Sequence, residues 1–342
     1  MARTWQIDRP QLQELGGVGE PVESIYVVLF GGRVDVVPQS GRGDVRLDVH
    51  EVFGRPLAVS LDDGALRVEH HKEPGSPLLG MVKGLFATGG KASARLTLTV
   101  PADAKVTINT VSAEALIGGV EGDVTVNTVS GAVSLSRLSG RVDVNTVNSS
   151  IDAAGLSGEL RSKSVSGRLT VDESALRLAK LGTVSGPLIL DLVGSSSVVT
   201  ATTISGDITI RIPAGSGYDV SAGSQSGHVI VDGHTLSRGT EKGGHRSAGD
   251  RSLAIKARAV SGNVVVLRDA STTEPHRRAD TLAPLTGTPS DVQDVRRSDR
   301  QDVRPPDPRR APAPDARTDT GSPPGSATRT NEHGFFDAGS GI

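Results

Sequence analysis

Hydrophobic and polar residues alternate along most of the first 268 residues of the chain. Between residues 105 and 267, two apolar residues separated by one other residue recur at a nearly constant spacing. The pairs are Ala115/Ile117, Val133/Leu135, Ile151/Ala153, Leu169/Val171, Leu188/Leu190, Ile208/Ile210, Val229/Val231 and Val264/Val266. Successive side chains of a strand point to opposite faces, so each pair predicts a short β-strand with one buried face.

A four-residue phrase, most often Thr-Val-Ser-Gly, comes before each pair. Its eight copies begin at Thr110, Thr128, Thr146, Ser164, Thr183, Thr203, Ser224 and Ala259, and the serine positions are 18, 18, 18, 19, 20, 21 and 35 residues apart. A weaker Ser-Gly copy lies at the half-period, as in Leu138–Gly140 and Leu156–Gly158. Glycine and serine favour turns. The period therefore predicts coils of about 18 residues, each with two strands and two tight corners.

Three asparagines decide between an antiparallel meander and a climbing coil. Asn109, Asn127 and Asn145 recur at 18 residues and are absent from the half-period, and Lys163 ends the series. Only a coil with like strands stacked in parallel places such residues directly above one another, where their amides can form a structural ladder. We therefore predict an all-β fold, a parallel β-solenoid, with the right-handed sense that crossovers between parallel strands favour.

The N-terminal part predicts a less regular version of the same fold. Residues 1–19 are expected to form a cap segment, and residues 20–104 a β region with an insertion at 72–91. Within the insertion, five apolar residues share one side at helical spacing: Leu78, Met81, Val82, Leu85 and Phe86. Two interpretations stay open: a short amphipathic helix that touches a membrane or a partner, or a helix folded over the end of the solenoid.

The C-terminal part is expected to finish the solenoid and continue as a tail. The Gly-, Ser- and charge-rich residues 233–250 predict a long exposed loop, and 253–257 with 264–267 predict the final strands, which would close the repeat region 105–268. Ten of the 19 prolines lie in residues 271–342. This segment has too few apolar residues for a core, so we expect a disordered tail.

Composition narrows the possible functions. Aromatic residues make up 2% of the chain, so the core is expected to be aliphatic. The chain has no cysteine, which excludes disulfides and thiol catalysis, and its net charge of −2 gives no electrostatic case for nucleic acid. Residues 1–19 lack the apolar core of a secretory signal, and no apolar run reaches 18 residues. We therefore expect a cytoplasmic protein without a transmembrane segment.

Candidate chemistry is confined to one set of outward side chains. Asp172, Asp191 and Arg211 each follow a serine position by six residues, which would stack them on neighbouring coils. Two carboxylates are the minimum for glycoside hydrolysis, but a charge ladder on a solvated strand is the simpler interpretation. Pairs such as His70-His71 point to opposite faces of a strand, so we expect no metal site and no cofactor.

The Thr-Val-Ser-Gly units, together with Trp5-Gln6-Ile7 and Gly32-Arg33-Val34-Asp35-Val36, resemble a bacterial family of putative-adhesin β-strand-repeat proteins of unknown function. The resemblance covers roughly residues 3–268 and implies a β-solenoid without assigned catalytic residues. Our leading hypothesis is a non-enzymatic, adhesin-like interaction protein with a protein or polysaccharide partner, with association with the cell envelope and peripheral membrane contact both left open. The rivals are a carbohydrate-active enzyme using Asp172 and Asp191, and a cytoplasmic scaffold acting through its tail.

Overall fold

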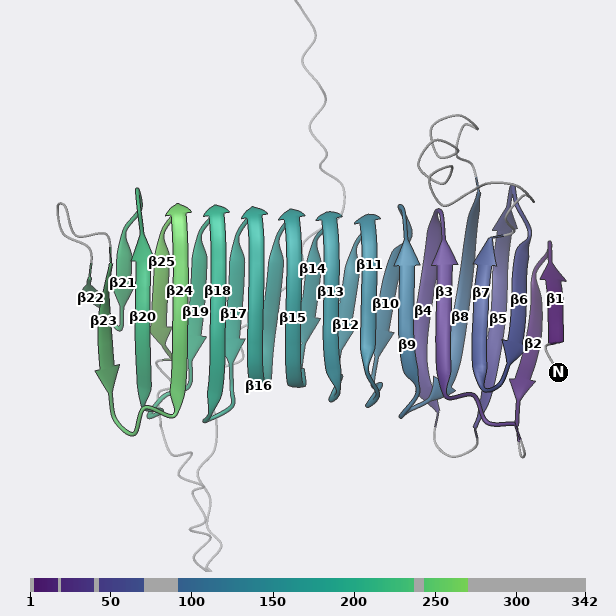
Figure 1. The fold of residues 1–342 in the computed structure, drawn as a ribbon, viewed down its shortest axis with the longest axis horizontal. Helices are drawn as coiled ribbons and strands as arrows, with labels where there is room; N and C mark the ends of the chain where they lie inside the picture. Colours follow the sequence, from purple (N-terminus) through teal and green to yellow (C-terminus); the bar gives the residue numbers. More distant parts are fainter. Residues whose placement is uncertain (1–2, 18–19, 40–42, 71–91, 237–242, 270–342) are drawn as a thin grey trace, which may run out of the picture. The chain divides into compact units, whose positions relative to one another are not determined.

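The chain forms a coil with two facing β-sheets, and in the regular coils successive strands belong to opposite sheets (Figure 1). The computed structural model describes residues 3–17, 20–39, 43–70, 92–236 and 243–269, all of which belong to one unit, Met1–Pro275. The second unit, His276–Ile342, lies outside the described residues. The described part contains 25 strands and no helix.

We call the first sheet sheet A. In spatial order it contains β1 (Arg3–Ile7), β6 (Leu57–Asp62), β7 (Ala65–His70), β3 (Ser24–Leu29), β9 (Lys105–Thr110), β11 (Val124–Ser130), β13 (Arg141–Asn148), β15 (Ser157–Ser166), β16 (Leu169–Ser185), β18 (Ser197–Ser205), β24 (Leu253–Ser261), β20 (Tyr218–Ser224) and β23 (Gly243–Ala248).

We call the facing sheet sheet B. It contains β2 (Gln11–Gly16), β5 (Asp44–Phe53), β8 (Ser93–Pro101), β4 (Gly32–Gln39), β10 (Glu114–Gly118), β12 (Val133–Ser136), β14 (Ile151–Ala154), the first part of β16, β17 (Leu188–Leu192), β19 (Ile208–Ile212), β25 (Val264–Arg268), β21 (Val229–Val231) and β22 (His234–Thr235).

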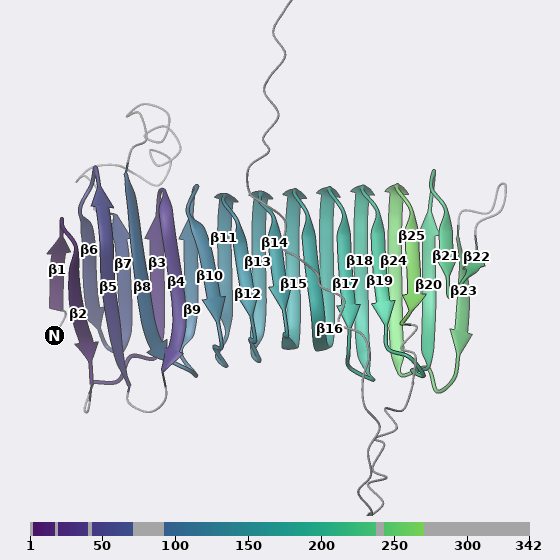
Figure 2. The ribbon, with the colours of Figure 1, turned by 180° about the vertical axis from the view of Figure 1, so that it is seen from behind.

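The regular coils stack in parallel with the register that the period predicts. Val106, Val124 and Val142 align across β9, β11 and β13, and Val133 aligns with Ile151 across β12 and β14. The coils climb in the right-handed sense (Figures 1 and 2). The predicted right-handed parallel β-solenoid is confirmed.

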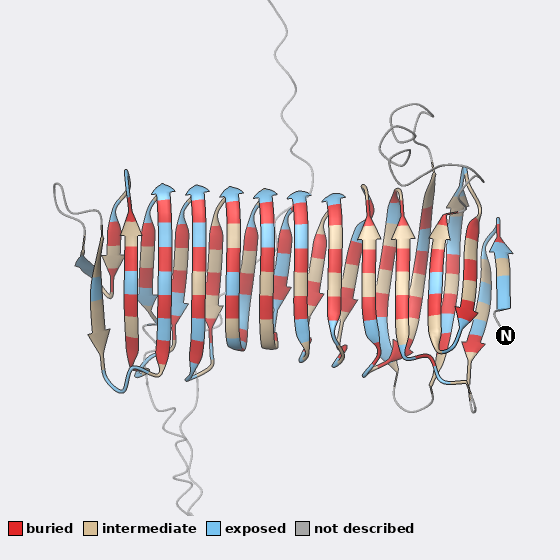
Figure 3. Ribbon diagram, in the orientation of Figure 1, coloured by how far each residue is buried: buried red, intermediate tan, exposed pale blue. Residues whose placement is uncertain are grey.

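The core lies between the two sheets and is almost entirely aliphatic. Buried and outward positions alternate along the strands between the two ends of the stack, which gives the banding in Figure 3. Burial of one Val, Leu or Ile side chain is worth roughly 1.5–3 kcal/mol. A single coil contributes only a few such side chains, so the fold depends on coils covering one another.

The order of coils in space differs from their order in sequence at both ends. Near the N-terminus, the β3–β4 coil lies between the β7–β8 coil and the β9–β10 coil. Near the C-terminus, the β24–β25 coil lies between β18–β19 and β20–β21. Residues 253–257 and 264–267, predicted as the final strands, are the last strands in sequence but not the last in space. After β19 the chain continues to β20 and β21, which lie two positions further along the stack. The position between them is occupied later in the sequence, by β24 and β25.

Antiparallel strands cover both ends of the stack. At the N-terminal end, β1 pairs with β6 and β2 with β5, so residues 1–19 contribute strands. At the C-terminal end, β22 and β23 pair with β21 and β20, within the stretch predicted as a loop. An edge strand can be held by backbone hydrogen bonds to one neighbour and does not need alternating apolar residues. The sequence of residues 233–250 lacks such alternation, so it gave no sign of β22 and β23.

The insertion 72–91, with Leu78, Met81, Val82, Leu85 and Phe86, and the tail 271–342 lie outside the described residues. Among the residues that are described, no helix is long and apolar enough to cross a membrane.

Candidate functional site

The corner at the end of each regular sheet A strand places one side chain inward and the next outward. The inward residues are buried hydroxyls, namely Thr110, Thr128, Thr146, Ser164, Thr183 and Thr203. Some bond from coil to coil: Thr110 Oγ1 donates to Thr128 Oγ1 at 2.8 Å, and Thr146 Oγ1 donates to Ser164 Oγ at 3.0 Å. Others bond the corner backbone, since Ser164 Oγ donates to the Ser166 carbonyl and Thr183 Oγ1 to the Ser185 carbonyl, whereas Thr203 Oγ1 has no partner among the described residues.

At the corners of β11, β13, β15, β16, β18 and β24, the residue after the inward position is aliphatic and points outward, and these residues form a row; at the last of these corners the inward residue is Ala259 instead of a hydroxyl. We call this set the apolar row; its members are 44–52% exposed and comprise Val129, Val147, Val165, Val184, Ile204 and Val260. At about 4.8 Å per coil, the row extends about 24 Å. It ends at the next coil, where Gln225 takes the corresponding place. Single exposed apolar residues are common on protein surfaces, but six in register form a continuous patch.

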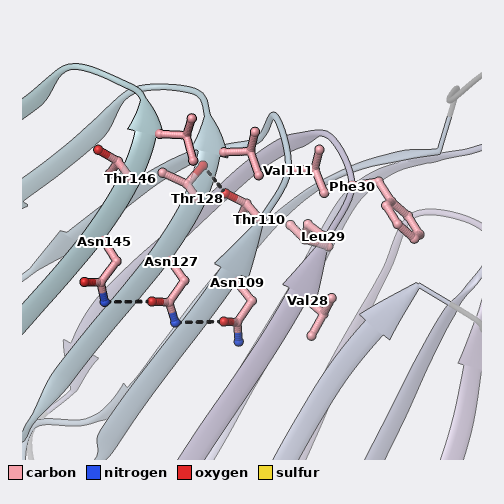
Figure 4. A pocket seen from close by; sticks show the side chains of 12 residues that line it. Val28, Leu29, Phe30, Asn109, Thr110, Val111, Asn127, Thr128, Asn145 and Thr146 are labelled. Carbon is pink, nitrogen blue, oxygen red and sulfur yellow. Dashed lines mark hydrogen bonds between the residues drawn. The ribbon is translucent and has the colours of Figure 1, made fainter. Parts of the chain in front are cut away.

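An asparagine ladder runs beside the N-terminal half of the row (Figure 4). Asn127 Nδ2 donates to Asn109 Oδ1, and Asn145 Nδ2 donates to Asn127 Oδ1, both at 2.9 Å. The Nδ2 atom of Asn109 is buried and has no hydrogen-bond partner among the described residues. The ladder covers three coils and stops at Lys163, which aligns with Asn145.

Two shallow hollows lie along the apolar row. The first has a volume of about 340 Å³ and is lined by the asparagine ladder, by Val129 and Val147 of the row, and by Val111 and Phe30 at its N-terminal end (Figure 4). The second has a volume of about 320 Å³ and is lined by Lys163, Val184 and Ile204. Both hollows therefore belong to one surface feature, which lies on the outer face of sheet A.

The C-terminal half of the same face is basic. Lys163, Lys180, Lys256 and Arg258 are exposed on β15, β16 and β24, and we call them the cationic group. None of them forms an ion pair with a described residue. The nearby carboxylate of Glu159 is already shared by Arg141, Arg161 and Arg177, which lie 3.6, 3.3 and 2.6 Å away.

The predicted acidic candidates lie in sheet B, on the other side of the solenoid. Asp191 and Arg211 align across β17 and β19 and form an ion pair of 3.3 Å. Desolvation raises the pKa of Asp191, the charge of Arg211 opposes this, and the charge of Asp172 adds to the rise. Asp172 is exposed at the irregularity in β16. The described residues contain no cluster of His, Asp or Glu able to hold a metal. A catalytic role for Asp172 and Asp191 stays a prediction.

The apolar row was missed in the sequence, although its residues belong to the repeated phrase itself. Thr and Val are adjacent in Thr-Val-Ser-Gly, so one must point inward and the other outward. Hydrophobicity alone assigns the valine to the core. The structure places the threonine inward because its hydroxyl bonds the corner, as when Thr128 Oγ1 donates to the Ser130 carbonyl at 2.8 Å.

Solved structures of two bacterial proteins are among those similar to the chain. A putative cell adhesion protein from Clostridium sporogenes is 12% identical, with a TM-score of 0.24, and the match covers 76% of this chain and 100% of that one. A putative lipid binding protein from Parabacteroides distasonis is also 12% identical, with a TM-score of 0.28, and the match covers 75% of this chain and 96% of that one. A search of curated proteins found no match.

The strand repeat, its corner phrase and the two-sheet solenoid agree with a family assignment. The family model described as Toastrack DUF4097 matches residues 33–267, which is more than half of the chain. The resemblance noted from the corner phrase is thereby confirmed. The chain belongs to the Toastrack DUF4097 family.

Proposed function

We propose that the chain is a non-enzymatic interaction module that binds its partner along the apolar row on the outer face of sheet A. The observation that carries the proposal is the row itself, six half-exposed aliphatic side chains in register. Covering the exposed half of each would contribute about 1 kcal/mol. An extended partner that contacts several coils at once adds these small contributions together.

The regular spacing supports a partner that is itself extended or flat. The row, the asparagine ladder and the two hollows all run across the strands, from coil to coil. A small ligand would contact only two or three coils and would leave most of the row exposed. An adhesin-like contact with a long molecule or a surface uses the whole length.

A single introduced cysteine tests whether the row is covered. The chain has no native cysteine, so Val147→Cys can be labelled at one position with a polarity-sensitive fluorophore. Val193→Cys is the matched control, because Val193 is 55% exposed and lies outside the row. The labelled proteins are mixed separately with the membrane, soluble and cell-wall fractions of cells that express the chain.

We expect at least one fraction to shift the emission of the label at position 147 to shorter wavelength and to leave the control unchanged. Such a result means that a partner covers the row. Equal responses at the two positions, or no response in any fraction, would overturn the proposal. The assay reports on coverage of the row and does not require the partner to be identified.

A further inference from the structure

The apolar row differs in charge between its two halves. In the N-terminal half, Val129 and Val147 follow the neutral Asn127 and Asn145 on the same strand face. In the C-terminal half, the cationic group replaces the amides: Lys163 precedes Val165 on β15, Lys180 precedes Val184 on β16, and Lys256 and Arg258 precede Val260 on β24. Residues two or four apart on a strand point the same way, so cations and valines share one face.

The cationic group is concentrated and has no paired counter-charge among the residues that the structure describes. Its strands lie in the order β15, β16, β18 and β24, so the cations extend across about 14 Å at about 4.8 Å per strand. Neighbouring members of the group lie about 7–10 Å apart, which is no more than the Debye length of about 8–10 Å, so they repel one another. No described carboxylate is paired with any of them. An anionic partner would relieve the repulsion.

We propose that this half of the row docks on the surface of an anionic lipid bilayer. The cationic group would contact the lipid headgroups, and Val165, Val184, Ile204 and Val260 would enter the interface beside them. This inference deepens the proposed function, on which it rests, by naming the partner. A membrane has both properties that the face requires, negative charge and accessible apolar material.

A bilayer fits this face better than a soluble polyanion does. A polyanion would bind the cations and would gain nothing from four aliphatic side chains in register beside them. The row is straight, one residue wide and parallel to the stack of coils, so a flat surface can touch all its members at once. Each Lys or Arg near an anionic membrane strengthens binding on the order of fivefold, and the aliphatic contacts add to this.

Vesicle flotation of the full-length protein tests the proposal. Vesicles of equal parts phosphatidylcholine and phosphatidylglycerol are compared with vesicles of phosphatidylcholine alone. The charge variant is Lys180→Gln with Lys256→Gln, and the apolar variant is Val165→Ser with Val184→Ser and Val260→Ser. Matched controls on sheet B are Arg46→Gln with Arg95→Gln, and Val37→Ser with Leu267→Ser, all at exposed positions.

We expect binding to the anionic vesicles only, weakened at least tenfold by the charge variant and by the apolar variant and unchanged in both controls. A fluorophore at Val260→Cys should shift on these vesicles more than one at Val129→Cys, because the cations surround only the former. Circular dichroism of each variant checks that the fold is retained.

Three results would overturn the proposal: no binding to anionic vesicles, equal loss of binding in the sheet B controls, or loss in the charge variant with none in the apolar variant. The last would indicate an anionic polymer, which inorganic polyphosphate can then test directly. If vesicles fail but the label at position 147 still responds to a cell fraction, the proposed function stands with a different partner. If both assays fail, both proposals are wrong.

Discussion

At the residue scale, the corner phrase has two separate roles. The threonine is buried, and its hydroxyl satisfies the corner, as in the bond from Thr110 to Thr128. The valine that follows is exposed and contributes to the row. Where the phrase reads Thr-Val, two adjacent residues with similar shapes therefore stabilise the fold and form the surface, and the hydroxyl distinguishes them.

One buried titratable residue gives a prediction on pH. His70 is 2% exposed, and its ring centroid lies 5.5 Å from that of Phe30. Desolvation is the main cause that lowers the pKa of His70 from 6.5, and the charge of Arg55 lowers it further. The folded state therefore takes up a proton on His70 at a lower pH than the unfolded state, which does so below about pH 6.5.

Stability should accordingly be full above about pH 6.5 and be lost as the pH falls toward the lowered pKa of His70, at a rate of at most about 1.4 kcal/mol per pH unit. His70→Gln removes the titrating group and should flatten this slope in urea unfolding measured between neutral and mildly acidic pH. His228→Gln, at an exposed position, should retain it. An unchanged slope in His70→Gln would contradict the assignment.

At the element scale, the Ser-Gly corners are set by the close approach of the coils. A Cβ on Gly186 would lie 2.1 Å from the carbonyl oxygen of Gly167, and Gly186 also has a φ of +131°. A Cβ on Gly206 would lie 2.2 Å from the Gly186 oxygen, without a positive φ. Glycine therefore occupies these stacked corner positions because the backbone of the neighbouring coil leaves no room for a Cβ atom.

Three alanine substitutions separate the steric overlap from the backbone strain. Gly215 has a φ of +79° and open space around it, so Gly215→Ala should cost only the left-handed strain, about 1–2 kcal/mol. Gly206→Ala should lower the free energy of unfolding by about 1–3 kcal/mol, because its methyl group would overlap the backbone of the neighbouring coil. Gly186→Ala combines both and should be the least stable in urea unfolding. If Gly186→Ala is no worse than Gly215→Ala, the coils relax around the methyl group.

At the scale of the folded unit, the order of coils makes the last strands in sequence internal ones. β24 lies between β18 and β20, and β25 lies between β19 and β21 (Figure 2). The β20–β21 coil must leave one place open until residues 253–268 arrive. Contacts that close late and over long sequence separations slow folding.

Hydrogen exchange can test this order in the unmodified protein. Amides of β24 and β25 should be protected as well as those of β18 and β19, and better than those of the end strand β23. Terminal segments usually fray first, so a simple sequential stack predicts the opposite ranking.

Ile255→Ala should destabilise the protein by about 2–5 kcal/mol, as expected for a fully packed core position. Ile210→Ala in β19 is the matched internal control, since both side chains are buried. A much smaller effect at Ile255 than at Ile210 would contradict the internal placement of the last coil.

The repeat determined the coil, the register of its strands, its aliphatic core and the asparagine ladder, because these follow from side-chain alternation and from a fixed period between neighbouring coils. The resemblance based on the corner phrase also identified the family correctly. The position of Asp191 beside Arg211 followed from the same period.

Only the tertiary structure decided the rest. Three features depend on which sheet edge is free to pair and on which polar group needs a hydrogen-bond partner. They are the internal positions of the β3–β4 and β24–β25 coils, the antiparallel strands at both ends, and the outward valines. Alternation of apolar and polar residues identifies strands. Where the 18-residue period is absent, it does not identify the neighbour with which each strand pairs. The candidate binding face could not be read from alternation either, because the structure exposes the valine and buries the residue before it, whether that residue is a threonine, the serine Ser164 or the alanine Ala259.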